Sequence, residues 1–135
     1  MFSYIRGFTF GWDAKKGDFF KSSAKESLQL MKERTNSDTV IIALAALQNH
    51  PQSTEIDYEG EHMVSGEELE KMIVFSHSIG LRVILKPTIN CKDGTWRAHI
   101  NFFDMEIPCE PKWADWFLSY TDYQLHYARI AEKTG

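Results

Sequence analysis

Trp12 and Lys86 are the side chains whose type and position point most directly to binding chemistry. Trp12 follows Gly11 at the end of an apolar run, and the face of an indole ring can pack against the C–H face of a sugar. A place in the core is the alternative for this tryptophan. Lys86 follows the apolar residues 83–85, and burial of its ammonium is costly without polar partners. We therefore expect Lys86 either to point into a polar pocket or to form a structural ion pair.

Amide side chains follow two of the apolar runs. Gln48 and Asn49 come at the end of one run, and Asn90 comes at the end of another. Each amide offers donors and an acceptor, which suits the recognition of hydroxyl groups, although loop asparagines commonly cap turns. The polar stretch 49–64 is long for a connection between a strand and a helix. We therefore expect it to form part of a binding rim.

Six acidic residues lie in two polar segments: Asp57, Glu59, Glu61, Asp104, Glu106 and Glu110. A glycosidase with two catalytic carboxylates holds an acid and a nucleophile on rigid elements at a defined separation. Because the six residues fall in predicted loops, we interpret them as solvated charges. No residue of the chain is assigned a catalytic role.

Neither a metal site nor a cofactor is predicted. The five histidines show no H-x-x-x-H or H-E-x-x-H spacing, and the two cysteines, Cys91 and Cys109, form no C-x-x-C pair. The motifs G-x-S-x-G, G-x-x-x-x-G-K-[ST] and G-x-G-x-x-G are also absent from the sequence. Their absence argues against serine hydrolase chemistry and against nucleotide binding.

The composition is that of a globular domain, with 43% hydrophobic and 25% charged residues in a chain of 135. A net charge of −4 provides no positive field for a phosphate backbone, so nucleic acid is not expected as a partner. The longest apolar stretch, 40–47, is much shorter than the roughly 20 residues of a membrane span, and no membrane partner is expected. The first residues lack the pattern of an export signal, so the expected location is cytoplasmic.

Three apolar runs predict strands near 5–12, 39–48 and 82–90. The middle run is apolar on consecutive residues, which is typical of a strand covered on both faces in a parallel sheet. Each run is followed by enough chain for a crossover helix. The pattern therefore favours three parallel strands.

Segments with helical spacing of apolar residues follow the three runs. An S-x-x-E capping box at Ser23 predicts a helix over 23–34, and a second box at Ser65 begins a helix that ends before Gly80. A glycine in that place is suited to the left-handed conformation after a helix. Pro111, which a first helical turn tolerates, precedes a third helix with a wide aromatic stripe.

Three strand–helix units in this order predict an α/β fold with the topology of the first three βα units of a (β/α)8 TIM barrel. A full barrel needs about 250 residues, so we expect residues 1–135 to be an incomplete domain, the N-terminal portion of such a barrel. A fourth strand is expected after the last helix and is not found. Because three strands alone expose two sheet edges and an apolar inner face, we expect association with the remainder of a barrel or self-association.

Two segments carry a resemblance to a known family: I-R-G-F-T-F-G-W over 5–12 and G-L-R-V-I-L-K-P over 80–87. Together with Glu26-Ser27-Leu28, Trp96 and the block 113–120, they resemble glycoside hydrolase family 113. Members of that family are (β/α)8 barrels and include retaining endo-β-1,4-mannanases. The resemblance covers essentially the whole chain and the first three βα units of the family's barrel.

The resemblance implies a cleft for an oligosaccharide or polysaccharide to which Trp12, Lys86, Asn90 and Trp96 contribute, beside Gln48. The family's acid/base glutamate follows strand four and its nucleophile follows strand seven, and no residue here matches either position. The chain is thus expected to be the N-terminal part of a retaining glycoside hydrolase acting on β-1,4-linked mannan-type polysaccharide, without activity of its own. The alternatives are a non-catalytic carbohydrate-binding module and a self-associating α/β module.

Overall fold

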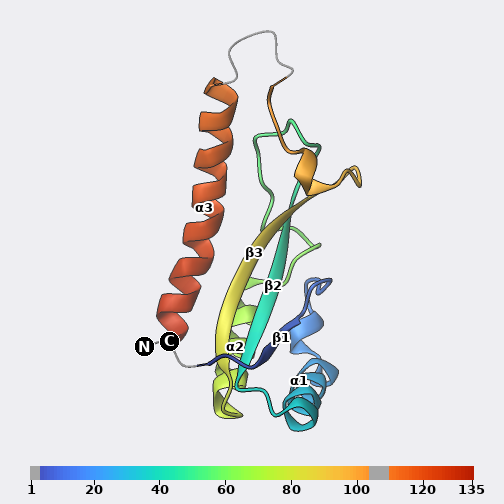
Figure 1. The fold of residues 1–135 in the computed structure, drawn as a ribbon, viewed down its shortest axis with the longest axis vertical. Coiled ribbons are helices and arrows are strands. Elements are labelled where there is room, and N and C mark those ends of the chain that lie inside the picture. Colours follow the sequence, from blue (N-terminus) through green and yellow to red (C-terminus); the bar gives the residue numbers. More distant parts are fainter. Residues whose placement is uncertain (1–3, 104–109) are drawn as a thin grey trace.

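The computed structural model describes residues 4–103 and 110–135, and its described part contains one parallel sheet (Figure 1). The strands are β1 (Gly7–Phe10), β2 (Thr39–Gln48) and β3 (Arg82–Cys91), in the spatial order β1-β2-β3. The order and the parallel direction confirm the predicted topology.

β1 is shorter than the range 5–12 predicted for it. At its end Gly11 has a φ of 78° and turns the chain, and a Cβ at this position would lie 2.7 Å from Cζ of Phe19. At its start the amide of Arg6 donates to Oδ1 of Asp38 at 3.1 Å instead of extending the ladder. The strand is therefore limited at both ends by contacts outside the sheet.

Helices follow each strand, as predicted. They are α1 (Ser22–Thr35), α2 (Gly66–Ser78) and α3 (Glu110–Thr134), and two short 3-10 helices, η1 (Asp18–Phe20) and η2 (Arg97–His99), lie in the loops. In Figure 1 α3 stands beside β3. Among the described residues, no helix combines the length and apolarity needed to cross a bilayer.

The two predicted capping boxes had different outcomes. Ser65 and Glu68 form the reciprocal pair at the start of α2, since the Ser65 hydroxyl accepts from the Glu68 amide and the Glu68 carboxylate accepts from the Ser65 amide at 2.8 Å. The box predicted at Ser23 and Glu26 is wrong. The N-cap of α1 is Lys21, whose side chain makes no capping bond, because η1 continues directly into the helix and its last turn fixes where α1 begins.

The end of α2 is the predicted left-handed one. Gly80 has a φ of 79°, its amide donates to the carbonyl of His77 at 2.9 Å, and the amide of Leu81 donates to the carbonyl of Ser76 at 2.9 Å. This pair of bonds is a Schellman motif. It returns the chain directly into β3.

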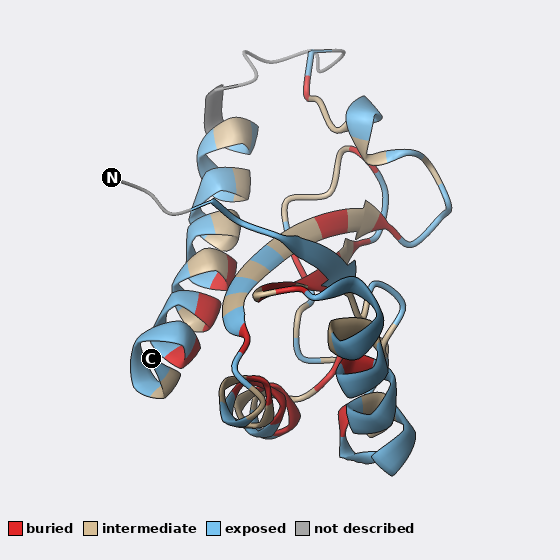
Figure 2. Ribbon diagram, turned by 60° about the horizontal axis from the view of Figure 1, so that its bottom comes forward, coloured by how far each residue is buried: buried red, intermediate tan, exposed pale blue. Residues whose placement is uncertain are grey.

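One face of the sheet forms the core. Alternate β2 residues, Val40, Ile42, Leu44 and Ala46, are buried in a single cluster with apolar residues of all three long helices. On the opposite face Ile41 is only partly covered, and along the first half of β3 exposed residues alternate with partly buried ones (Figure 2). A sheet with helices on one face only is what three units of an eight-stranded barrel would show.

Candidate functional site

The loops that follow the three strands meet at the carboxyl end of the sheet. The polar loop after β2 is held in place by the backbone of Asp57, which exchanges hydrogen bonds of 2.9 and 2.8 Å with Leu47. The loop after β3 is tied to it, since the amides of Lys92 and Asp93 donate to the carbonyls of Gln48 and Asn49 at 2.8 and 3.2 Å. These bonds hold the loops after β2 and β3 in place at the carboxyl end of the sheet.

Trp12 lies at this end and is not a core residue. Its exposed fraction is 39%, and the guanidinium carbon of Arg97 lies 5.0 Å from the centre of its ring. Trp12 follows β1 and Arg97 belongs to η2 after β3, so the fold brings together two loops that are far apart in the sequence. An aromatic face beside a planar cation with five N–H donors can bind a ring that carries hydroxyl groups.

Lys86 and Asn90 project from the same face of β3. They are in register with Ala43 and Leu47 of β2, and alternate residues of a strand share a face. Lys86 is exposed, and its ammonium forms neither an ion pair nor a hydrogen bond with the residues that the structure describes. The structural ion pair considered for Lys86 is therefore not formed within this part of the chain.

Gln48 lies beneath the site with both ends of its amide engaged. Its exposed fraction is 1%, its Nε2 donates to the carbonyls of His50 and Pro51 at 2.9 and 3.3 Å, and its Oε1 accepts from Nε1 of Trp116 at 2.9 Å. In this position Gln48 braces the loop after β2 against α3. Direct contact of Gln48 with a ligand stays a prediction.

Trp96 is also at this end of the sheet, and its exposed fraction is 68%. Its ring meets His99 edge to face, with 6.2 Å between the ring centres. The structure shows no contact between Trp96 and Trp12. The neighbouring residue, Arg97, contacts Trp12 instead. No local pattern in the sequence singles out Arg97.

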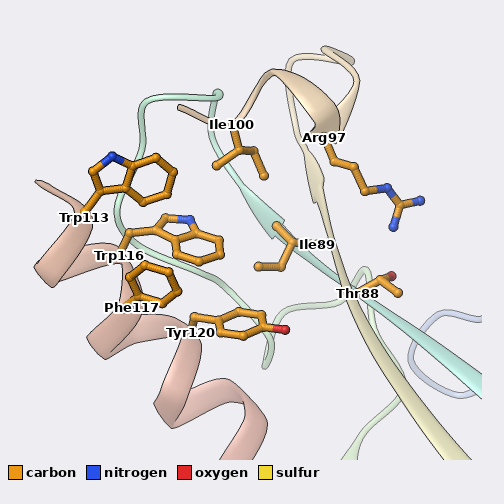
Figure 3. A pocket seen from close by; sticks show the side chains of 8 residues that line it. All are labelled: Thr88, Ile89, Arg97, Ile100, Trp113, Trp116, Phe117 and Tyr120. Carbon is orange, nitrogen blue, oxygen red and sulfur yellow. The ribbon is translucent and has the colours of Figure 1, made fainter. Parts of the chain in front are cut away.

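A groove of about 590 Å³ lies between β3, η2 and the first turns of α3 (Figure 3). The residues that line this α3 groove are Thr88, Ile89, Arg97, Ile100, Trp113, Trp116, Phe117 and Tyr120. Trp116 and Tyr120 stack with 5.0 Å between ring centres and 10° between planes. The aromatic stripe predicted for this helix thus covers one wall of a groove at the end of the sheet.

Hydrogen bonds from a buried tyrosine hold the floor of the site. The hydroxyl of the buried Tyr123 lies 2.9 Å from the carbonyl oxygen of Thr88 and 3.2 Å from that of Leu44. Leu44 is in register with Pro87, which has no amide hydrogen to donate. The carbonyl of Leu44 also accepts a hydrogen bond from the Thr88 hydroxyl at 3.1 Å. Burial raises the pKa of Tyr123 well above its usual range, so the phenol remains a neutral donor.

Two of the predicted loop carboxylates, Asp57 and Glu61, bind groups of the loops themselves. Oδ1 of Asp57 accepts from the amides of Glu59 and Gly60 at 3.2 Å, and the exposed Glu61 pairs with Lys16 at 2.6 Å. Of the other predicted carboxylates, Asp104 and Glu106 lie outside the described residues, and the side chain of Glu110 is not described. No cluster of three metal-ligating side chains occurs in the ranges 4–103 and 110–135.

The comparison with known proteins identifies the family. The model of Glycoside Hydrolase Family 113 matches residues 8–135. This chain belongs to glycoside hydrolase family 113. Among curated proteins a search found no match.

Solved structures of family members superpose closely on the chain. Two structures of a GH113 β-1,4-mannanase, one of them a complex, have 62% sequence identity and a TM-score of 0.93, and each aligns with 98% of this chain and 43% of its own. The GH113 β-mannanase of Alicyclobacillus acidocaldarius, in complex with ManMIm, has 38% identity, a TM-score of 0.89 and coverages of 99% and 42%. The chain therefore spans less than half the length of these relatives. Its three βα units match the N-terminal part of their barrel.

Proposed function

We propose that this family 113 chain forms the first part of the substrate cleft of a retaining glycoside hydrolase that acts on β-1,4-linked mannan-type polysaccharide. The observation that carries the proposal is the half-exposed Trp12 ring at the carboxyl end of β1, with the guanidinium of Arg97 beside it. The two solved relatives with 62% identity are structures of a β-1,4-mannanase, which supports the choice of glycan.

The proposed sugar contacts divide into a platform and a set of polar groups. Trp12 supplies an apolar surface for the C–H face of a sugar ring. Lys86 and Asn90 supply donors and an acceptor from one face of β3. Trp96 supplies a second exposed ring farther along the loop, and Gln48 holds the loop after β2 in position.

We propose that the chain contains neither catalytic carboxylate. Retaining hydrolysis requires an acid and a nucleophile about 5–5.5 Å apart on rigid elements. Two of the loop carboxylates have other partners, since Asp57 binds the backbone of its own loop and Glu61 binds an exposed lysine. On this proposal the chain binds glycan but does not hydrolyse it.

The proposed partner is a polypeptide that supplies the remaining βα units, and residues 1–135 are proposed to be an incomplete domain. Ile84 on the inner face is 40% exposed, and on α3 Phe117 and Leu118 are exposed at 54% and 66%. The ten-residue β3 forms an edge of the described sheet. Such apolar surface and an open edge favour association. A cytoplasmic location stays a prediction from the sequence.

Calorimetric titration of the chain with β-1,4-mannohexaose tests the proposal. We expect binding that Trp12→Ala weakens about tenfold, the effect of losing roughly 1.4 kcal/mol. Phe20→Ala is the matched control, since Phe20 is a half-exposed aromatic on η1 whose ring lies under Lys71, outside the site. Absence of binding by the wild-type chain, or equal loss in both variants, would refute the proposal.

The second candidate function is a non-catalytic carbohydrate-binding module. Lys86, which has no ion-pair or hydrogen-bond partner among the described residues, and the accessible Trp12 favour it, because both are available in the chain without a further domain. The two candidates differ in what a complementing polypeptide does. If the remaining units of a family 113 barrel, added in trans, produce mannan hydrolysis, the hydrolase proposal is supported and the module is rejected.

A further inference from the structure

Arg97 has an unusual position in the site. It belongs both to the wall of the α3 groove and to the contact with Trp12. In Figure 3 the aromatic side chains of α3 lie on one wall, and Arg97 comes from the opposite wall with its guanidinium turned away from them. The residue therefore lies where the groove meets the Trp12 platform.

The backbone that carries Arg97 is well supported. The amide of Thr95 donates to Oδ1 of Asp93 at 2.9 Å, which also holds the pKa of Asp93 below its usual value. The amide of His99 donates to the carbonyl of Trp96 at 2.9 Å and closes the turn of η2. Because these bonds hold the backbone on both sides of Arg97, the loop loses little conformational entropy when a ligand binds.

The guanidinium itself is available for a ligand. It forms no ion pair with any residue in the described part of the chain. The guanidinium contacts the face of the Trp12 ring, and this contact occupies none of the guanidinium N–H donors in a conventional hydrogen bond. A guanidinium over an aromatic face still has its fork of five N–H donors for other acceptors. Adjacent hydroxyl oxygens of a sugar are acceptors that fit this fork.

We propose that Arg97 is a specificity-determining residue of the cleft, which donates hydrogen bonds to the hydroxyl groups of a mannosyl unit packed beside Trp12. The proposal rests on the proposed function and adds a residue to it. On this account the contact with Trp12 positions the guanidinium, and the guanidinium fixes the orientation of the sugar ring. A lysine in this place would keep the charge and lose the planar fork.

Titration with β-1,4-mannohexaose tests this role by comparing the wild-type chain with Arg97→Ala, Arg97→Lys and Trp12→Ala. We expect Arg97→Ala to weaken binding on the order of tenfold, the effect of losing a charge-assisted hydrogen bond. Arg97→Lys should recover only a small part of this loss. Thermal unfolding of the three variants checks that each is folded.

The outcomes separate this inference from the proposed function. Wild-type affinity in Arg97→Ala, together with weakened binding in Trp12→Ala, would overturn the role of Arg97 and leave the cleft intact. Tighter binding by Arg97→Ala would also overturn it, because the guanidinium would then compete with the sugar for the ring. Absence of binding by the wild-type chain would overturn the proposed function itself. Wild-type affinity in Arg97→Lys would show that the positive charge alone is sufficient. It would then refute the proposed role of the planar guanidinium donors.

Discussion

Glu68 joins two segments of the fold and is the position at which we expect the largest loss from removing a single polar group. Its carboxylate is completely buried. Oε2 accepts from the amide and the hydroxyl of Ser65, both at 2.8 Å, and Oε1 accepts from the amide of Phe19 at 3.3 Å. Glu68 therefore caps α2 and at the same time binds it to η1, whose Phe19 ring stacks on Phe10 at the end of β1.

The substitution Glu68→Ala removes all three bonds. The reciprocal cap of α2 contributes about 1 kcal/mol. The buried amide of Phe19 loses its acceptor, which costs about 1–3 kcal/mol. We therefore expect the free energy of unfolding to fall by about 2–4 kcal/mol. Glu68→Gln keeps the volume and one acceptor oxygen, and about half of that loss is expected.

Urea unfolding followed by far-ultraviolet circular dichroism measures the effect. The matched control is Glu67→Ala, because the neighbouring side chain is 69% exposed and pairs with Lys71 on the helix surface. Removing such a pair costs about 0.3–0.5 kcal/mol. If Glu68→Ala is no more destabilising than Glu67→Ala, the carboxylate does not hold η1 on α2 and the reasoning is wrong.

Three further substitutions test other parts of the fold. Tyr123→Phe leaves the Thr88 carbonyl without its buried donor and should lower the free energy of unfolding by about 1–1.5 kcal/mol in urea; an unchanged midpoint would contradict this. The Thr39 hydroxyl and the Arg6 amide, with Arg82, hold the pKa of Asp38 well below its usual range. The native carboxylate is therefore favoured above the unfolded pKa of about 3.9, and this stability is lost as pH falls, so Asp38→Asn should show a shallower decline in melting temperature below about pH 4. A decline as steep as that of the wild type would refute this role for Asp38. Gly11→Ala places a Cβ in a left-handed position 2.7 Å from Phe19; we expect a loss of about 1–3 kcal/mol, and a wild-type melting temperature would show that the turn relaxes freely.

The strands and helices could be predicted because their signals are local. The consecutive apolar residues of β2 and the helical spacing after each strand are set by burial within one element. The cap at Ser65 also needs only four residues in sequence. The box at Ser23 failed although it has the same local pattern, since the preceding η1 turn decides where α1 starts.

The site could be predicted only in part. Trp12, Lys86 and Asn90 follow apolar runs, and in a parallel sheet that places them at one end or on one face. The contact of Arg97 with Trp12 depends on the order of three strands and on a turn in a long loop. Gln48 has the same sequence signal as Asn90, but its amide is engaged by Trp116 from a helix 68 residues later. No local pattern carries that information.

We propose that these three βα units bind glycan while the acid and the nucleophile of hydrolysis lie outside them. The most direct test is a reducing-sugar assay of the purified 135-residue chain on β-1,4-mannan. We predict no release above that of a buffer control, even at high protein concentration. Release of reducing sugar that Asp57→Asn or Glu61→Gln abolishes would contradict the claim, because a loop carboxylate of this chain would then perform the chemistry.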